Sequence, residues 1–61
     1  MIWFAEENRQ GTQALLYCDD DSDMGEDLVQ FGEDNHLKKG AKCMSLATRL
    51  VKFLNSRGEW V

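Results

Sequence analysis

The chain ends in Asn55-Ser56-Arg57-Gly58-Glu59-Trp60-Val61, and this stretch decides the predicted fold. Asparagine in the first position of a type I turn bonds its own backbone, and a glycine after the two central residues takes the left-handed conformation. A type I turn followed by a glycine bulge closes a β-hairpin. The pattern therefore predicts a hairpin that turns between Asn55 and Gly58, with residues 51–54 on the incoming strand and Trp60 and Val61 on the returning strand.

The same stretch also has a helical interpretation. Apolar side chains recur at helical spacing between residues 43 and 54, basic side chains fall between them, and Gly58 fits a helix C-cap. Against a helix from about Ser45 to Arg57 stand the Asn-x-x-Gly turn and the Trp60-Val61 ending, which a helix leaves without a role. We therefore expect strands, with one hairpin spanning residues 41–61.

The Asn-x-x-Gly pattern occurs a second time, from Asn8 to Gly11. The apolar start of the chain precedes it, and Thr12 to Cys18 follows with a short apolar run of strand length. This arrangement predicts a first hairpin over residues 2–18, in which residues 2–7 pair with residues 12–18. The predicted fold class is mainly all-β: two antiparallel hairpins that form one small sheet in a single domain of 61 residues.

An acidic segment, residues 19–40, joins the two predicted hairpins and is expected to be a loop. It contains at most one short helical turn, around residues 25–31, with Asp23 or Ser22 as its N-cap. Leu28 and Phe31 are expected to hold the loop against the sheet. Its first part carries four closely spaced aspartates: Asp19, Asp20, Asp21 and Asp23.

Most of the large apolar area of the chain belongs to a few aromatic side chains, each of which can bury about 150 to 250 Å². A chain this short is marginally stable alone and gains from association with other chains. We therefore expect these aromatic residues to form either the core or an interface with a neighbour. They are Trp3, Phe4, Tyr17, Phe53 and Trp60.

The net charge of -4 is unevenly distributed along the chain. Residues 19–34 contain eight acids and no base, whereas residues 38–57 contain six bases and no acid. Direct nucleic-acid binding through the acidic half is not expected, because phosphate contacts need clustered Lys and Arg. The separation of charge suits association between copies, in which the acidic segment of one copy meets the basic hairpin of another.

No arrangement of residues points to catalysis. His36 has no nucleophile in a recognisable frame, and the serines lie in no nucleophile elbow. Cys18, His36 and Cys43 are too far apart in sequence for a zinc pattern. We expect the two cysteines to be reduced, half-buried thiols on strands, and the protein not to be an enzyme.

The aspartates at positions 19, 21 and 23 begin like a calcium-binding EF-hand loop, but the pattern does not continue. Met24 stands where the loop needs glycine, and Gln30 stands where it needs a bidentate glutamate. A solvated acidic loop is therefore expected, and neither a metal nor a cofactor is predicted.

The start of the chain does not resemble a secretory signal. Residues 1–4 lack a positive charge, and Glu6 and Glu7 follow soon after. No apolar run approaches the roughly 20 residues that span a bilayer. We expect a protein that makes no contact with a membrane and is synthesised in a cytoplasm.

The second half of the chain resembles small structural proteins encoded among the virion genes of tailed bacteriophages. The similarity covers residues 17–61, and Val29, Ala41 and Lys52 depart from the pattern, which has Pro, Ser and often an aromatic residue there. The residues that carry the similarity are Asp27-Leu28, Asn35, Gly40, Thr48 and the run from Val51 to Trp60.

The resemblance implies a β-hairpin over residues 41–61 and a non-enzymatic role in the virion, as a head, neck or tail accessory protein. The expected partners are other virion proteins and further copies of this chain. An alternative from a different class is an acidic phage-encoded inhibitor that presents residues 19–34 as a phosphate mimic to a nucleic-acid-binding protein of the host.

Overall fold

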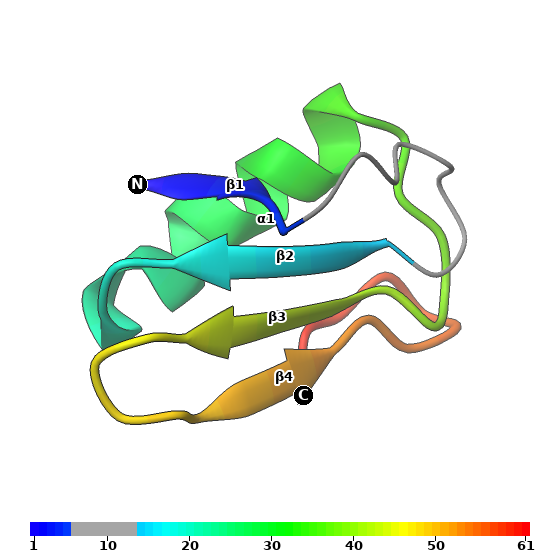
Figure 1. The fold of residues 1–61 in the computed structure, drawn as a ribbon. Coiled ribbons are helices and arrows are strands. Elements are labelled where there is room, and N and C mark those ends of the chain that lie inside the picture. Colours follow the sequence, from blue (N-terminus) through cyan, green and yellow to red (C-terminus); the bar gives the residue numbers. More distant parts are fainter. Residues whose placement is uncertain (6–13) are drawn as a thin grey trace.

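The computed structural model describes residues 1–5 and 14–61 and shows one mixed sheet covered on one side by helical structure (Figure 1). The sheet order is β1-β2-β3-β4, with β1–β2 and β3–β4 antiparallel and β2–β3 parallel. The elements in chain order are β1 (Ile2–Phe4), β2 (Leu15–Cys18), the 3-10 helix η1 (Asp21–Met24), α1 (Glu26–Asp34), β3 (Lys42–Ser45) and β4 (Val51–Phe53).

The expectation of two antiparallel hairpins joined by a loop is therefore correct only in part. The protein is a sheet-rich α+β domain, and its two halves meet through the parallel pair β2–β3, in which Leu16 lies opposite Cys43. Parallel neighbours need a long crossover connection, usually helical. The acidic segment is that crossover, which explains why it contains η1 and α1 where an irregular loop was expected.

The strands of the first predicted hairpin pair as expected, because β1 and β2 are antiparallel neighbours. Ile2 lies opposite Cys18 and Phe4 lies opposite Leu16, and the Ala5 N–H donates to the Leu15 carbonyl at 2.8 Å. The predicted turn at Asn8 and Gly11 falls outside the described residues.

The C-terminal part of the chain forms strands and not the competing helix. β3 pairs with β4, and the Asn55–Gly58 turn then brings Trp60 back beside Leu54. Gly58 has a φ of 81°, and its N–H donates to the Asn55 carbonyl at 3.1 Å, as a type I turn with a glycine bulge requires. A second turn joins β3 to β4, and its Arg49 has a φ of 66°.

The crossover helix is longer than the single turn that the sequence suggested. Leu28 is fully buried and Gly32 is also buried, so one face of α1 packs on the sheet. The predicted caps Asp23 and Ser22 lie inside η1, and the residue that caps η1 is Asp20.

A Schellman motif ends α1. The Leu37 N–H donates to the Gly32 carbonyl at 2.9 Å, and the His36 N–H donates to the Glu33 carbonyl at 3.2 Å. His36 occupies the left-handed position of this motif, with a φ of 56°. Glycine is the usual residue there because a side chain is strained in that conformation.

The core lies between α1 and the sheet and is built from small and aliphatic side chains. None of the five aromatic residues expected in a core or interface is fully buried; Phe4 and Trp60 pack at the edge of the core cluster. Phe4 contacts Phe31 of α1, with ring centroids 5.5 Å apart. The core cluster consists of Ala14, Leu16, Cys18, Met24, Leu28 and Cys43.

Two adjacent helix positions test this core. Leu28→Ala removes a fully buried side chain, so it should cost about 2 to 5 kcal/mol of unfolding free energy. Val29→Ala, at a side chain that is 44% exposed, is the matched control and should change stability by less than about 0.5 kcal/mol. Urea denaturation followed by circular dichroism measures both, and equal losses for the two variants contradict the assigned orientation of α1.

The C-cap of α1 gives a second test. His36→Gly relieves the left-handed strain and should raise the unfolding free energy by about 0.5 to 1 kcal/mol. Asn35→Gly is the control: Asn35 has an ordinary φ of -105°, so glycine there should destabilise the protein. Thermal unfolding compares the two variants, and a loss of stability for His36→Gly excludes the Schellman geometry.

Candidate interaction surface

One face of the sheet is covered by α1, and the other carries a row of apolar side chains. Side chains alternate between the two faces along each strand, so the residues between the core positions point away from α1. In Figure 1 both helical segments lie behind the sheet, and the viewer looks at this second face. We call it the open face; it consists of Trp3, Leu15, Tyr17, Lys42, Met44, Val51 and Phe53.

The register of the strands arranges the open face in two rows across the sheet. The first row lies toward the carboxyl ends of β2 and β3, and the second lies toward their amino ends. Trp3 and Tyr17 meet edge to face in the first row, with centroids 6.3 Å apart. The first row is Trp3, Tyr17, Met44 and Val51, and the second is Leu15, Lys42 and Phe53.

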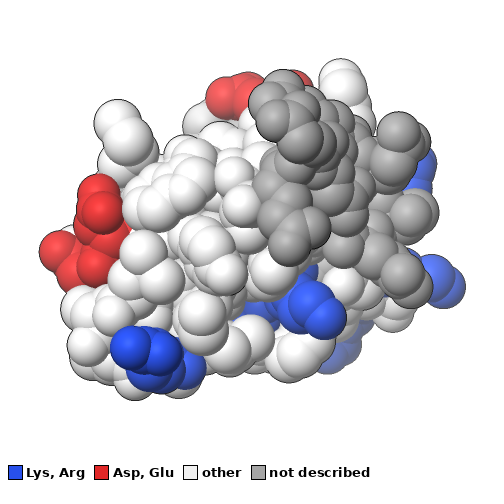
Figure 2. All heavy atoms as spheres, in the orientation of Figure 1, with Lys and Arg blue, Asp and Glu red and all other residues white. Residues whose placement is uncertain are grey.

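The side chains of the open face are partly or largely exposed to solvent. Phe53 is 49% exposed and Val51 is 38% exposed, whereas Trp3, Tyr17 and Met44 are half-buried. The Lys42 ammonium lies 6.0 Å from the centre of the Phe53 ring, so its aliphatic stem runs over apolar surface. Figure 2 shows mainly uncharged atoms on this face, with acidic groups gathered at the left and upper margins and basic groups in the middle, at the right and at the lower left.

Three of the five predicted aromatic residues lie on the open face: Trp3, Tyr17 and Phe53. Phe4 and Trp60 belong to the side that α1 covers. Sequence reasoning missed Leu15, Met44 and Val51 because ring size singled out the aromatic residues. Leu15 and Val51 each share a face with an aromatic residue two positions along the same strand. The alternation in Lys42-Cys43-Met44-Ser45 is the signal that places Met44 there.

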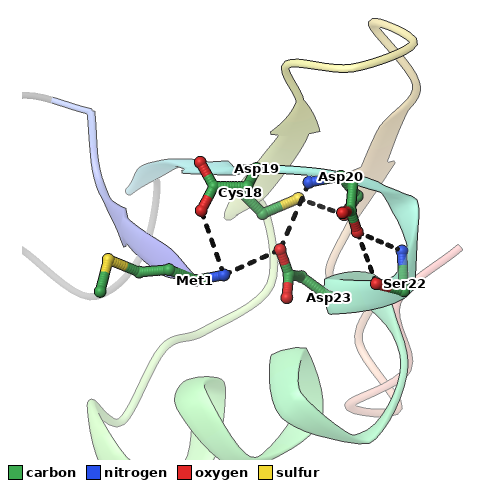
Figure 3. Close-up of polar contacts among 6 residues, drawn as sticks. All are labelled: Met1, Cys18, Asp19, Asp20, Ser22 and Asp23. Atoms are coloured by element: carbon green, nitrogen blue, oxygen red, sulfur yellow. Dashed lines mark hydrogen bonds and ion pairs between the residues drawn. The ribbon is translucent and has the colours of Figure 1, made fainter.

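The acidic stretch that precedes α1 forms a tight network of local bonds (Figure 3). The Asp20 carboxylate accepts from the Ser22 N–H at 3.0 Å and from the Ser22 hydroxyl, while the Asp20 N–H donates to Asp23 Oδ2 at 3.3 Å. These bonds form a capping box at the start of η1. Asp23 Oδ2 also accepts from the Met1 amino group at 2.9 Å, and Asp19 lies 3.4 Å from that amino group.

Asp21 ties the same stretch to the β3–β4 turn. The Thr48 hydroxyl donates to Asp21 Oδ1 at 2.7 Å. The Ser45 and Thr48 hydroxyls both lower the pKa of Asp21. The Ser45 hydroxyl is fully buried and makes no hydrogen bond of ordinary geometry within the described residues.

The cysteines are adjacent on β2 and β3 and are not bridged. Both are fully buried, not half-buried as expected, because they face α1. Burial raises the pKa of Cys43 to about 12 and also raises the pKa of Cys18. Both thiols are therefore protonated at neutral pH, which makes them poor nucleophiles and poor metal ligands.

A hollow of about 530 Å³ lies between the second half of α1 and the Asn55–Gly58 turn. Trp60 contributes apolar surface to it, and Glu33, His36 and Arg57 contribute polar groups. Its size falls in the range of small-ligand sites. Within the described residues, however, the His36 imidazole bonds no serine or cysteine side chain, so the geometry that activates a nucleophile is not assembled there.

Two further features of residues 1–5 and 14–61 bear on function. No three His, Cys, Asp or Glu side chains among them are arranged to hold a metal ion. None of their helices is both long enough and apolar enough to cross a bilayer.

Comparison with known proteins gave no match for this chain, whether against protein-family models, curated proteins or solved structures. The open face and the network at η1 are therefore interpreted from their own geometry.

The network at η1 should make stability depend on acid. The Met1 ammonium and the Asp20 N–H hold the pKa of Asp23 below its usual range, and hydroxyls do the same for Asp21. A lowered pKa in the folded state stabilises the fold above the unfolded-state pKa and loses this contribution as pH falls through the lower, folded-state value. The melting temperature should therefore fall below about pH 4.

Asp21→Asn and Asp23→Asn should each make the melting temperature less dependent on pH in that acid range. Glu33→Gln, at an exposed carboxylate near the other end of α1, is the control and should leave the acid dependence as it is. Thermal unfolding between about pH 2.5 and 7 gives the profiles. If the melting temperatures of both aspartate variants depend on pH as strongly as that of the wild type, the network does not cause the acid dependence of stability.

Proposed function

We propose that this protein is a non-enzymatic assembly component that binds neighbouring proteins through the open face. The main support for this proposal is the apolar face of the sheet that α1 does not cover. On this face the Phe53 side chain is 49% exposed. Soluble domains rarely expose a contiguous apolar patch without an interaction to make. The open face contains aromatic and aliphatic side chains and one charged residue, Lys42. The centres of protein interfaces have a similar composition, because they are rich in aromatic residues and poor in charged ones.

The resemblance of residues 17–61 to small bacteriophage virion proteins suggests the setting of this assembly role. A head, neck or tail accessory protein works by surface complementarity with its neighbours and needs no cofactor. The Asn55–Gly58 turn, which contributes to that resemblance, keeps residues 59–61 beside β4 and so widens the sheet. In this setting the partners are other virion proteins and copies of the chain itself.

The alternative role as an acidic phosphate mimic is less well supported by the geometry. A mimic must present its carboxylates to solvent with the spacing of the phosphates that the partner protein binds. Asp20, Asp21 and Asp23 instead accept hydrogen bonds from groups of the same chain. Part of the hydrogen-bonding capacity of these three carboxylates is therefore already used within the chain, at the start of the crossover.

Incorporation into particles tests the proposal. Phe53→Glu places a charge in the open face, whereas Val29→Glu places one at a comparably exposed position on α1 (44% against 49%). When each tagged variant is supplied during growth of the phage that encodes the chain, Phe53→Glu should be incorporated about tenfold less than wild type, and Val29→Glu normally.

Quantitative mass spectrometry of purified particles measures this incorporation, and circular dichroism checks that both variants fold. Particles that lack the wild-type chain contradict the virion setting. Equal incorporation of the two variants contradicts the use of the open face.

A further inference from the structure

We propose that the occupant of the open face is a second copy of this chain, packed face to face across a two-fold axis that runs perpendicular to the strands. The inference rests on the proposed function, because it takes the open face as the binding surface. It adds the identity of one partner and the orientation of the pair. Two observations support it: the arrangement of the two rows of the face, and the distribution of charge at the ends of the sheet.

The open face is large enough only for a weak dimer. Its four strands of three or four residues span about 14 Å by 13 Å at the usual strand and residue spacings. That area is well below the roughly 800 Å² of accessible surface that each partner of a standard interface buries. Projecting rings add area to a flat footprint. Two sheets packed in this way form a sandwich, in which inner faces interdigitate about 10 Å apart.

The two rows match each other under this symmetry. A two-fold axis between the rows and perpendicular to the strands lays the first row of one copy over the second row of its partner. Lys42 of one copy then meets the row that contains Tyr17 and Met44 of the other, and the two Lys42 side chains do not face each other. The Lys42 stem is already extended over Phe53, so its ammonium can reach the rim of the interface.

Charge at the ends of the sheet selects this axis over one parallel to the strands. Four aspartates lie between residues 19 and 23, directly after β2, and Lys38 and Lys39 lie shortly before β3. Because β2 and β3 are parallel, these groups lie at opposite ends of the sheet. A perpendicular axis brings the acidic end of one copy to the basic end of the other, whereas a parallel axis opposes like charges at both ends.

Sedimentation velocity and light scattering on the full chain test the dimer. Wild type should shift from a 7.0 kDa monomer to a species of about 14 kDa with a micromolar dissociation constant. Phe53→Glu should weaken association about tenfold or more, whereas Val29→Glu should not change it. A wild-type chain that stays monomeric up to about 500 µM, or a dimer that Phe53→Glu leaves intact, overturns the inference.

A charge exchange tests the orientation. Asp19→Lys alone and Lys39→Asp alone should each weaken the dimer about threefold, and the double variant Asp19→Lys/Lys39→Asp should restore it. Asp19 is suited to this test because its side chain is 61% exposed. Tighter association of the Asp19→Lys variant overturns the perpendicular axis, because that result indicates aspartates that face each other.

Failure of this inference is distinguishable from failure of the proposed function. If wild type is monomeric in solution but particle incorporation still depends on Phe53, the open face binds a different virion protein and the second copy is excluded. If the dimer forms through the open face but the particles lack the chain, the virion setting is excluded and the dimer stands.

Discussion

The parallel pairing of β2 with β3 is the constraint on which the rest of this structure depends. Two parallel neighbours cannot be joined by a tight turn, so the chain must cross from one end of the sheet to the other. That crossover places η1 and α1 on one side of a small sheet and leaves no further described helix for the opposite side. The same pairing puts the aspartates after β2 and the lysines before β3 at opposite ends. One topological choice therefore produces both the face that no described helix covers and its charge polarity.

Local features of this fold were predictable from the sequence, whereas its topology was not. The Asn55–Gly58 turn follows from residue types that favour one backbone conformation, and the structure has that turn. The pairing of β1 with β2 was also predicted. Strand order, by contrast, depends on which edges meet in space, and no short pattern in 61 residues encodes it. The acidic crossover was misread because its many charges suggested a solvated loop, although Met24, Leu28 and Phe31 recur at helical spacing.

The aromatic residues show how far a sequence can define an interaction surface. Alternation along β1 places Trp3 and Phe4 on opposite faces, and the register of β1 with β2 places Tyr17 on the face of Trp3. The pattern does not say which face a helix will cover. Size alone suggested that the rings form the core, but the core uses Leu16, Leu28 and two buried thiols instead. Three of the five named aromatics therefore lie on the open face, and the same alternation along each strand places the aliphatic residues beside them.

The proposed association through the open face would be coupled to folding, because the core of this protein is small. A 61-residue chain buries only about 60% of the surface that its unfolded form exposes, and here much of the ring-bearing surface is excluded from the core. Any partner that binds the folded state stabilises it by mass action. Apolar contact on the open face supplies the strength of such binding, whereas the charges at the ends of the sheet are more exposed and more screened. In the proposed dimer those charges therefore act on orientation, and variants that alter them should change how the faces meet more than whether they meet.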